Sequence, residues 1–213
     1  MLSSNDRSRI KLNAALPHAA IAAGSLLLGI ACGSAQAGEA FVGAYVHDVD
    51  DGISYGKFEN GTQIVVGART TALDELAFFG KPRVHLLVGV NTAGETSYAA
   101  TGLAWRFDLN ERFYVQPGIG IAIHDGRINL PSPNAPGLSP QERLSRLEDR
   151  RIRLDLGSRV LFEPELSVGW KANRRLSLEL SWIHLSHARL AGSYNPGVGD
   201  VGLRLLYRYG QDR

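Results

Sequence analysis

Hydrophobic residues alternate with small or polar residues along most of the chain after residue 38. In 113–123, large apolar side chains occupy every second position, and Gln116, Gly118 and Gly120 lie between them. A period of two is typical of a β-strand whose two faces meet different surroundings. We therefore expect eight strands, at 40–47, 62–70, 83–91, 98–107, 113–123, 160–170, 176–186 and 201–209.

The two faces of these strands indicate an all-β fold, an eight-stranded antiparallel transmembrane β-barrel. One face is uniformly apolar, as a lipid-facing surface is, whereas the other carries small residues and charges of both signs, which suit the packed interior of a small barrel. Pro117 and Pro164 cannot donate to the strand ladder, so we expect a bulge or an edge at each. Ion pairs are expected inside the barrel among Glu163, Glu165, Glu179, Arg106, Arg204 and Arg208.

The connections between the expected strands fit the same topology. With an even number of strands, both ends of the barrel domain lie in the periplasm. The short turns at 108–111 and 171–175 are then periplasmic, and the long connections after the first, fifth and seventh strands are extracellular. The connection at 71–82 departs from this pattern, because it should be a short periplasmic turn and is long and partly apolar.

The longest connection, 124–158, contains a helix start signal. Ser139, Pro140 and Glu142 have the spacing of an N-cap, a first-turn proline and a capping glutamate. We expect a short, charged helix from there to about Arg150, as a solvated decoration of an extracellular loop.

The first 37 residues have the features of a secretory signal peptide. Basic residues precede an apolar run from Ala19 to Ile30, and Ala35-Gln36-Ala37 supplies the small-x-small pattern that a signal peptidase recognises. Cleavage after Ala37 leaves a barrel domain, 38–213, without cysteine, since Cys32 is the only one. We therefore expect export to the outer membrane of a Gram-negative bacterium.

Composition narrows the function classes. The 213 residues are 44% hydrophobic with a formal net charge of +2, which argues against a disordered chain and against nucleic-acid binding. The sequence shows no cluster of metal ligands, so no metal or cofactor is expected.

The strand 176–186 places an unusual pair on its apolar face. Counting by twos from Trp182 leads to His184 and then to Ser186, at the outer end of the strand on the lipid side. Side chains two residues apart on a strand share a face, roughly 7 Å apart, so the imidazole is able to take the hydroxyl proton as a serine nucleophile requires. The alternative is that both are ordinary polar residues at the membrane interface.

Two segments together resemble the PagL family of outer-membrane lipid A 3-O-deacylases. These are "LGSRVLFEPELSVGW" and "RLSLELSWIHLSHARLAGSYNPGVGDVGLRLLYRY", which contain a His-x-Ser motif, an Asn-Pro-Gly loop and an aromatic-rich last strand. The resemblance implies an ester hydrolase with a Ser-His-acid site that acts on the lipopolysaccharide of the outer leaflet. In it Ser186 matches the nucleophile, His184 the general base and Asn195 an oxyanion donor, with a backbone amide near Ala188 or Arg189 as its partner.

The chain departs from the family pattern at two positions. The asparagine that directly follows the family's serine is His187 here. The family's acid is a glutamate at the start of the last strand, where this chain reads Val198-Gly199-Asp200. Asp200 is therefore the candidate acid, although alternation puts it on the interior face with Arg204 unless a bulge at Gly199 reverses it.

Two other functions stay open at this stage. A PagL-like barrel without activity, with a structural or surface-interaction role, is favoured by the missing glutamate. A secreted, soluble binding barrel needs its apolar faces turned inward. The sequence leaves open whether two barrels pair in the membrane as a homodimer.

Overall fold

The computed structural model describes residues 37–54, 57–190 and 195–210. The expected signal peptide, 1–37, lies outside these ranges except for Ala37. Among the described residues, the helices are all too short or too polar to cross a membrane.

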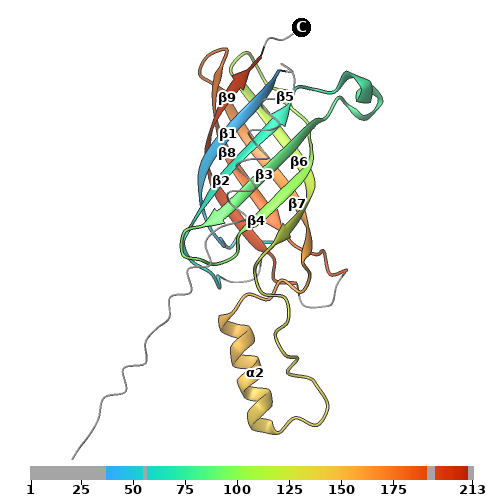
Figure 1. Ribbon diagram of the computed structural model, residues 1–213, viewed down its shortest axis with the longest axis vertical. Helices are drawn as coiled ribbons and strands as arrows, with labels where there is room; N and C mark the ends of the chain where they lie inside the picture. Colours follow the sequence, from blue (N-terminus) through green and yellow to red (C-terminus); the bar gives the residue numbers. More distant parts are fainter. Residues whose placement is uncertain (1–36, 55–56, 191–194, 211–213) are drawn as a thin grey trace, which may run out of the picture.

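The structure confirms a closed antiparallel barrel of eight strands (Figure 1). Neighbours in sequence pair with each other, and β1 pairs with β9 to close the cylinder. The alternating segments predicted from the sequence all form strands, with ends that move by a few residues. The elements are β1 (Gly38–Val46), β2 (Thr62–Thr70), β3 (Arg83–Asn91), β4 (Tyr98–Ala104), β5 (Phe107–Asp108), β6 (Phe113–His124), β7 (Val160–Lys171), β8 (Leu176–Leu185) and β9 (Val198–Tyr209).

The predicted strand 98–107 is interrupted, so that it appears as β4 and β5. Both pieces pair with β6 in one continuous register, with Ala104 opposite Gly118 and Phe107 opposite Val115. The break lies opposite Pro117, which has no N–H to donate to the ladder. The carbonyl oxygen of Pro117 still accepts from the N–H of Trp105, at 2.9 Å. Pro164, by contrast, lies within β7 without breaking its register with β6.

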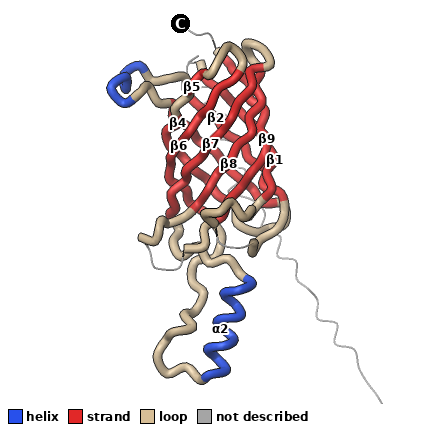
Figure 2. The backbone as a smooth tube through the Cα atoms, turned by 180° about the vertical axis from the view of Figure 1, so that it is seen from behind, coloured by secondary structure: helices blue, strands red, loops and turns tan. Residues whose placement is uncertain are grey.

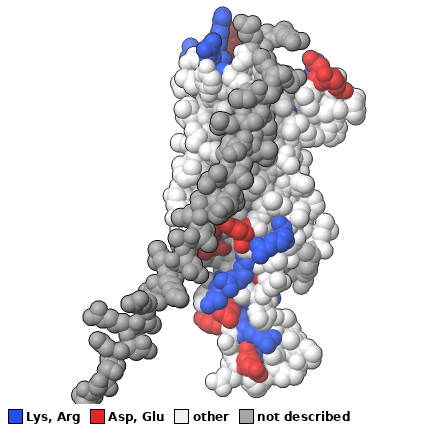
Figure 3. Space-filling model, viewed as in Figure 1, with Lys and Arg blue, Asp and Glu red and all other residues white. Residues whose placement is uncertain are grey.

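The wall of the barrel is apolar outside and polar inside, as a transmembrane barrel requires. Many large apolar side chains of the strands point outward and are exposed, whereas a smaller set, including Phe41, Leu87 and Leu206, is buried. Figure 3 shows that charged side chains on this face gather at the two ends and on the protruding loop. The outward-facing set includes Val42, Val90, Ile119, Ile121, Phe162, Val168, Leu180, Leu203 and Leu205.

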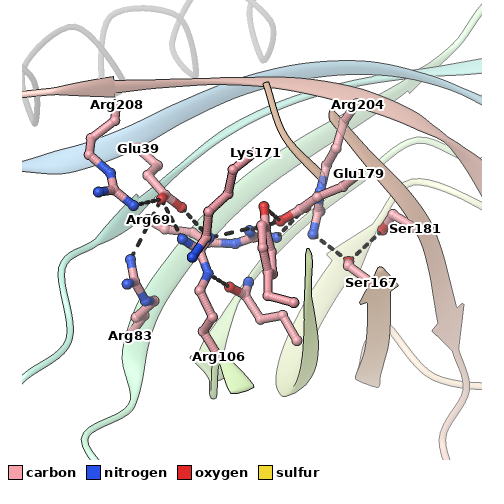
Figure 4. A network of polar contacts seen from close by, with 12 residues as sticks. Glu39, Arg69, Arg83, Arg106, Ser167, Lys171, Glu179, Ser181, Arg204 and Arg208 are labelled. Carbon is pink, nitrogen blue, oxygen red and sulfur yellow. Dashed lines mark hydrogen bonds and ion pairs between the residues drawn. The ribbon is translucent and has the colours of Figure 1, made fainter. Parts of the chain in front are cut away.

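Fully buried ion pairs fill the interior (Figure 4). Arg204 contacts both Glu165 and Glu179, and Arg69 bridges the same two carboxylates. The predicted pairing of Arg204 with Glu165 and Glu179 is thus confirmed, and removal of one arginine would leave two buried carboxylates sharing the other.

Other predicted interior pairs involve different partners. Arg106 forms a two-pronged pair with Glu39, at 2.8 and 2.7 Å, in addition to the predicted pair with Glu179, which is longer at 3.9 Å. Arg208 also pairs with Glu39, and Glu163 contacts His85. Glu39 was missed because the first strand begins earlier than its alternation indicated.

The two ends of the barrel differ, and we name them by their connections. Of the described residues, the loop end carries 47–54, 57–61, 92–97, 125–159, 186–190 and 195–197, whereas the turn end carries the short turns, the start of β1 and the end of β9. Helix α2 (Pro140–Ile152) projects beyond the loop end (Figure 1), and the predicted capping box of Ser139 and Glu142 is confirmed.

The 71–82 connection at the turn end contains the short helix η1 (Asp74–Phe79). Figure 2 shows it and α2 at opposite ends of the barrel. The ring of Phe79 packs edge-on against Trp105, and Phe78 is exposed.

Candidate active site

His184 and Ser186 lie on the outer face of the barrel where β8 reaches the loop end. The backbone of Ser186 forms a bridge with Phe162, donating at 3.2 Å and accepting at 2.8 Å. Residues paired across an antiparallel ladder point to the same side of the sheet, and Phe162 points outward. Ser186 therefore faces the lipid side, as the sequence predicted, and His184 shares this face two residues earlier.

Three groups hold the imidazole of His184. Its Nδ1 atom lies 3.3 Å from Oδ2 of Asp51 and 3.2 Å from Oγ of Ser54. Its ring stacks on that of Trp182, with centroids 5.9 Å apart. As a result His184 is 3% exposed and Ser186 is 9% exposed, although both face outward from the barrel.

Asp51 reaches this position from the loop that connects β1 and β2. Its Oδ1 atom accepts the backbone N–H groups of Ile53, at 3.0 Å, and Ser54, at 2.7 Å. Its Oδ2 atom accepts the indole N–H of Trp182, at 2.8 Å, and faces His184. Burial alone would raise the pKa of Asp51, but these donors and the nearby imidazole outweigh it, so the pKa lies below its usual value and the carboxylate is ionised.

Gly199 makes room for this carboxylate. It is the ladder partner of His184 on β9, and its carbonyl oxygen accepts the N–H of Val49 at 2.8 Å. A Cβ atom at this position would lie 2.4 Å from Oδ2 of Asp51, a distance that side chains do not adopt. The carboxylate thus occupies the space that a side chain at 199 would fill.

Asp200, the candidate acid from the sequence, lies on the other side of the sheet. It pairs with Ile183, and the register from Leu185 to Ile183 is continuous, so the bulge that would turn Asp200 outward is not formed. Its carboxylate contacts Nδ1 of His47 at 2.7 Å and accepts from the Tyr98 hydroxyl at 2.8 Å. The structure therefore does not bring Asp200 to His184.

The contact between Asp200 and His47 instead anchors the loop that carries Asp51. The second ring nitrogen of His47 lies 2.9 Å from Glu59, so the imidazole is clamped between two carboxylates from different elements. Burial lowers the pKa of His47, but the hydrogen bonds and charges of these carboxylates outweigh it and raise it to about 9. Asp48 completes the anchor by accepting the N–H groups of Phe58 and Glu59.

The residues expected to bind an oxyanion lie in the segment after Ser186. The side-chain oxygen of Asn195 accepts the backbone N–H of His187 at 3.2 Å, which places this asparagine beside the serine. Ala188 and Arg189 have φ values of +50° and +62°, and the N–H of Leu190 donates to the carbonyl of His187. Two successive left-handed residues form a tight turn that non-glycine residues rarely adopt, and such strain is concentrated at functional sites.

Asp51 and Ser54 are the site residues that the sequence did not identify. They lie 133 and 130 positions before His184, in an acidic, glycine-containing loop that resembles any solvated turn. No spacing motif links them to the His-x-Ser pair. Across the described ranges, no group of three or more His, Cys, Asp or Glu side chains is arranged to hold a metal ion.

Comparison with known proteins agrees with this fold. The crystal structure of the outer-membrane enzyme PagL is 17% identical, with a TM-score of 0.50, over 80% of this chain and 98% of that one. Two further solved structures are similar in fold. Neisserial surface protein A is 8% identical, with a TM-score of 0.45, over 83% of this chain and 98% of that one. The Yersinia pestis outer membrane protein Ail is 12% identical, with a TM-score of 0.40, over 81% of this chain and 99% of that one. No curated protein matches the chain. The family model of the lipid A 3-O-deacylase PagL matches residues 69–208, which is more than half of the sequence. The chain therefore belongs to the PagL family of lipid A 3-O-deacylases.

Proposed function

We propose that this protein is an outer-membrane serine esterase that removes the 3-O-linked acyl chain of lipid A. The observation that carries the proposal is the position of Ser186 and His184 on the outward face of the barrel wall, at its loop end. Membership of the PagL family supports the substrate class.

In the first half of the reaction, Ser186 is the nucleophile and His184 the general base. Nδ1 of His184 faces Asp51, which as an ionised carboxylate only accepts hydrogen bonds, so the ring proton resides on Nδ1. This tautomer leaves Nε2 to take the proton of the Ser186 hydroxyl as its Oγ attacks the ester carbonyl. The same nitrogen then donates that proton to the departing sugar oxygen.

In the second half, water hydrolyses the acyl-enzyme. His184 takes a proton from the water, whose oxygen attacks the acyl carbon, and returns it to Ser186 as the fatty acid leaves. Both tetrahedral intermediates carry negative charge on the former carbonyl oxygen. The amide group of Asn195 and a backbone N–H of the Ala188–Arg189 turn are the donors beside Ser186, and one such donor contributes about 3 kcal/mol in serine hydrolases.

The site is suited to a substrate that stays in the membrane. The loop end is extracellular in this proposal, so His184 and Ser186 lie level with the junction of sugar and acyl chains in the outer leaflet. Exposed apolar side chains of β8 and of its neighbouring strands, including Phe162, Leu180 and Leu203, continue from the site down the barrel wall. An acyl chain can contact this surface while its ester bond reaches Ser186. The signal peptide of residues 1–37 accounts for export to this membrane.

Hydrolysis of purified lipopolysaccharide in mixed micelles tests the proposal. We expect the purified protein to release the 3-linked fatty acid and Ser186→Ala to lose this activity by at least about 10³-fold. Ser177→Ala is the matched control, because Ser177 lies on the same strand at the turn end. Absence of release by the folded wild-type barrel would favour an inactive, structural role.

A further inference from the structure

We infer that Asp51 is the residue that orients the imidazole of His184, so that the carboxylate of this site comes from the first loop at the loop end and not from β9. The inference rests on the proposed function, since it assigns the third member of the Ser186–His184 site. Asp51 acts through His184, and is therefore a positioning residue.

The first support is that both oxygens of Asp51 have assigned partners. Oδ1 is fixed by two backbone N–H groups of its own loop, and Oδ2 is fixed by the indole of Trp182. Only one direction is left for the remaining lone pair of Oδ2, and His184 lies there. Because the carboxylate is held before substrate binds, it sets the ring orientation without reorganisation.

The second support is the glycine at position 199. Position 199 is the ladder partner of His184, so a carboxylate on β9 directly opposite the histidine would come from this position. Position 199 has no side chain in this protein, and the Asp51 carboxylate lies where one would begin. The loop therefore supplies a carboxylate at the place where a side chain on β9 would otherwise lie.

The third support is the anchor beneath the loop. Asp200 binds His47 and, more weakly, the N–H of Asp48, at 3.4 Å. Val49 donates to Gly199, which extends the loop along β9 by one more backbone bond. These bonds fix the chain immediately before Asp51. An orienting carboxylate has to be held in a fixed position, and this anchor provides that.

Ser54 competes with Asp51 for the same ring nitrogen of His184. Its hydroxyl, 3.2 Å from Nδ1, is able to donate to that nitrogen as well as accept from it. If the carboxylate is removed, donation from Ser54 favours the tautomer with its proton on Nε2, which is unable to accept a proton from Ser186. Asp51 therefore holds the ring in its basic tautomer against a competing neighbour.

A carboxylate transfer from the loop to the strand tests this inference, with kcat and KM measured on lipopolysaccharide in mixed micelles. We expect Asp51→Ala to lower kcat by about 10²–10⁴-fold with KM changed less than about twofold, since Asp51 contacts the base and not the membrane. Gly199→Glu alone should also be impaired, because its side chain meets the Asp51 carboxylate. The double variant D51A/G199E should recover at least about tenfold over D51A.

The controls separate the different ways in which the test can fail. Asp50→Ala removes the adjacent exposed carboxylate and should leave kcat unchanged. Folding of each variant is checked by heat-modifiable migration in SDS gels. If Asp51→Ala does not fold, Asp51→Asn takes its place. Full activity of D51A and of D51N would overturn the inference while leaving the proposed function intact. Lack of rescue by the Gly199→Glu substitution in a folded double variant would also count against it, whereas an active S186A would overturn the proposed function itself.

Discussion

Replacement of Gly199 by alanine is the smallest change that separates Asp51 from His184. The new Cβ would lie 2.4 Å from Oδ2 and 2.9 Å from Cγ of Asp51, whereas ordinary van der Waals contact begins at 3.4 Å. The carboxylate must therefore retreat by about 1 Å. Its contact with Nδ1 is already 3.3 Å, so a shift of this size takes it beyond hydrogen-bonding distance.

We expect this variant to lose about 10²-fold in kcat, which is the typical cost of misplacing a catalytic arrangement by 1 Å. The assay is release of fatty acid from purified lipopolysaccharide at saturating substrate. The barrel should remain folded, because the strand register at Gly199 involves only backbone atoms.

A double-mutant cycle isolates the cause. In an Asp51→Ala background the methyl group of residue 199 meets no carboxylate, so the second substitution should cost less than about twofold. Two results would refute the reasoning: wild-type activity of Gly199→Ala, or an equal loss from it with and without Asp51. The second result would assign the effect to the carbonyl of Val49, which lies 3.2 Å from the same Cβ position.

Three further predictions concern stability. Arg204→Met should destabilise the barrel towards urea by about 3–5 kcal/mol, because Glu165 and Glu179 are left with Arg69 as their one fully buried arginine partner among the described residues. The pKa of His47 is raised to about 9, so its ion pairs contribute about 3 kcal/mol to the free energy of unfolding below pH 6.5, and this contribution is lost as the pH rises through 9. Urea unfolding at pH 6 and 10 should show this difference in the wild type and not in His47→Gln. Ser139→Ala should destabilise α2 by about 1 kcal/mol through loss of the capping box, measured as faster amide exchange in 140–152 with no change in the barrel.

The strands of this barrel were predictable because lipid and packed interior select opposite side chains at every second position. Where that contrast weakens, the prediction was less accurate. The first strand begins at Gly38 rather than at residue 40, so Glu39 was not recognised as the partner of Arg106. The interruption after Ala104 depends on Pro117 in the neighbouring strand, which is a property of the register and not of either segment alone.

The site was predictable only as far as it lies on one strand. His184 and Ser186 share a face through the period of two, and the interior position of Asp200 follows from the same rule. Asp51 has no such relation to them. Its approach to His184 depends on the turn that Ile53 and Ser54 close, on the Trp182 indole and on the space above Gly199. These are contacts between distant segments, and one sequence contains no record of them.

Mass spectrometry of lipid A from cells that express this protein tests its central claim most directly. We predict that the wild-type protein converts lipid A to a form lacking one 3-linked acyl chain, and that Ser186→Ala at equal abundance in the outer membrane leaves lipid A unaltered. Unchanged lipid A in cells with a folded wild-type barrel would contradict the account, as would conversion by the Ser186→Ala protein.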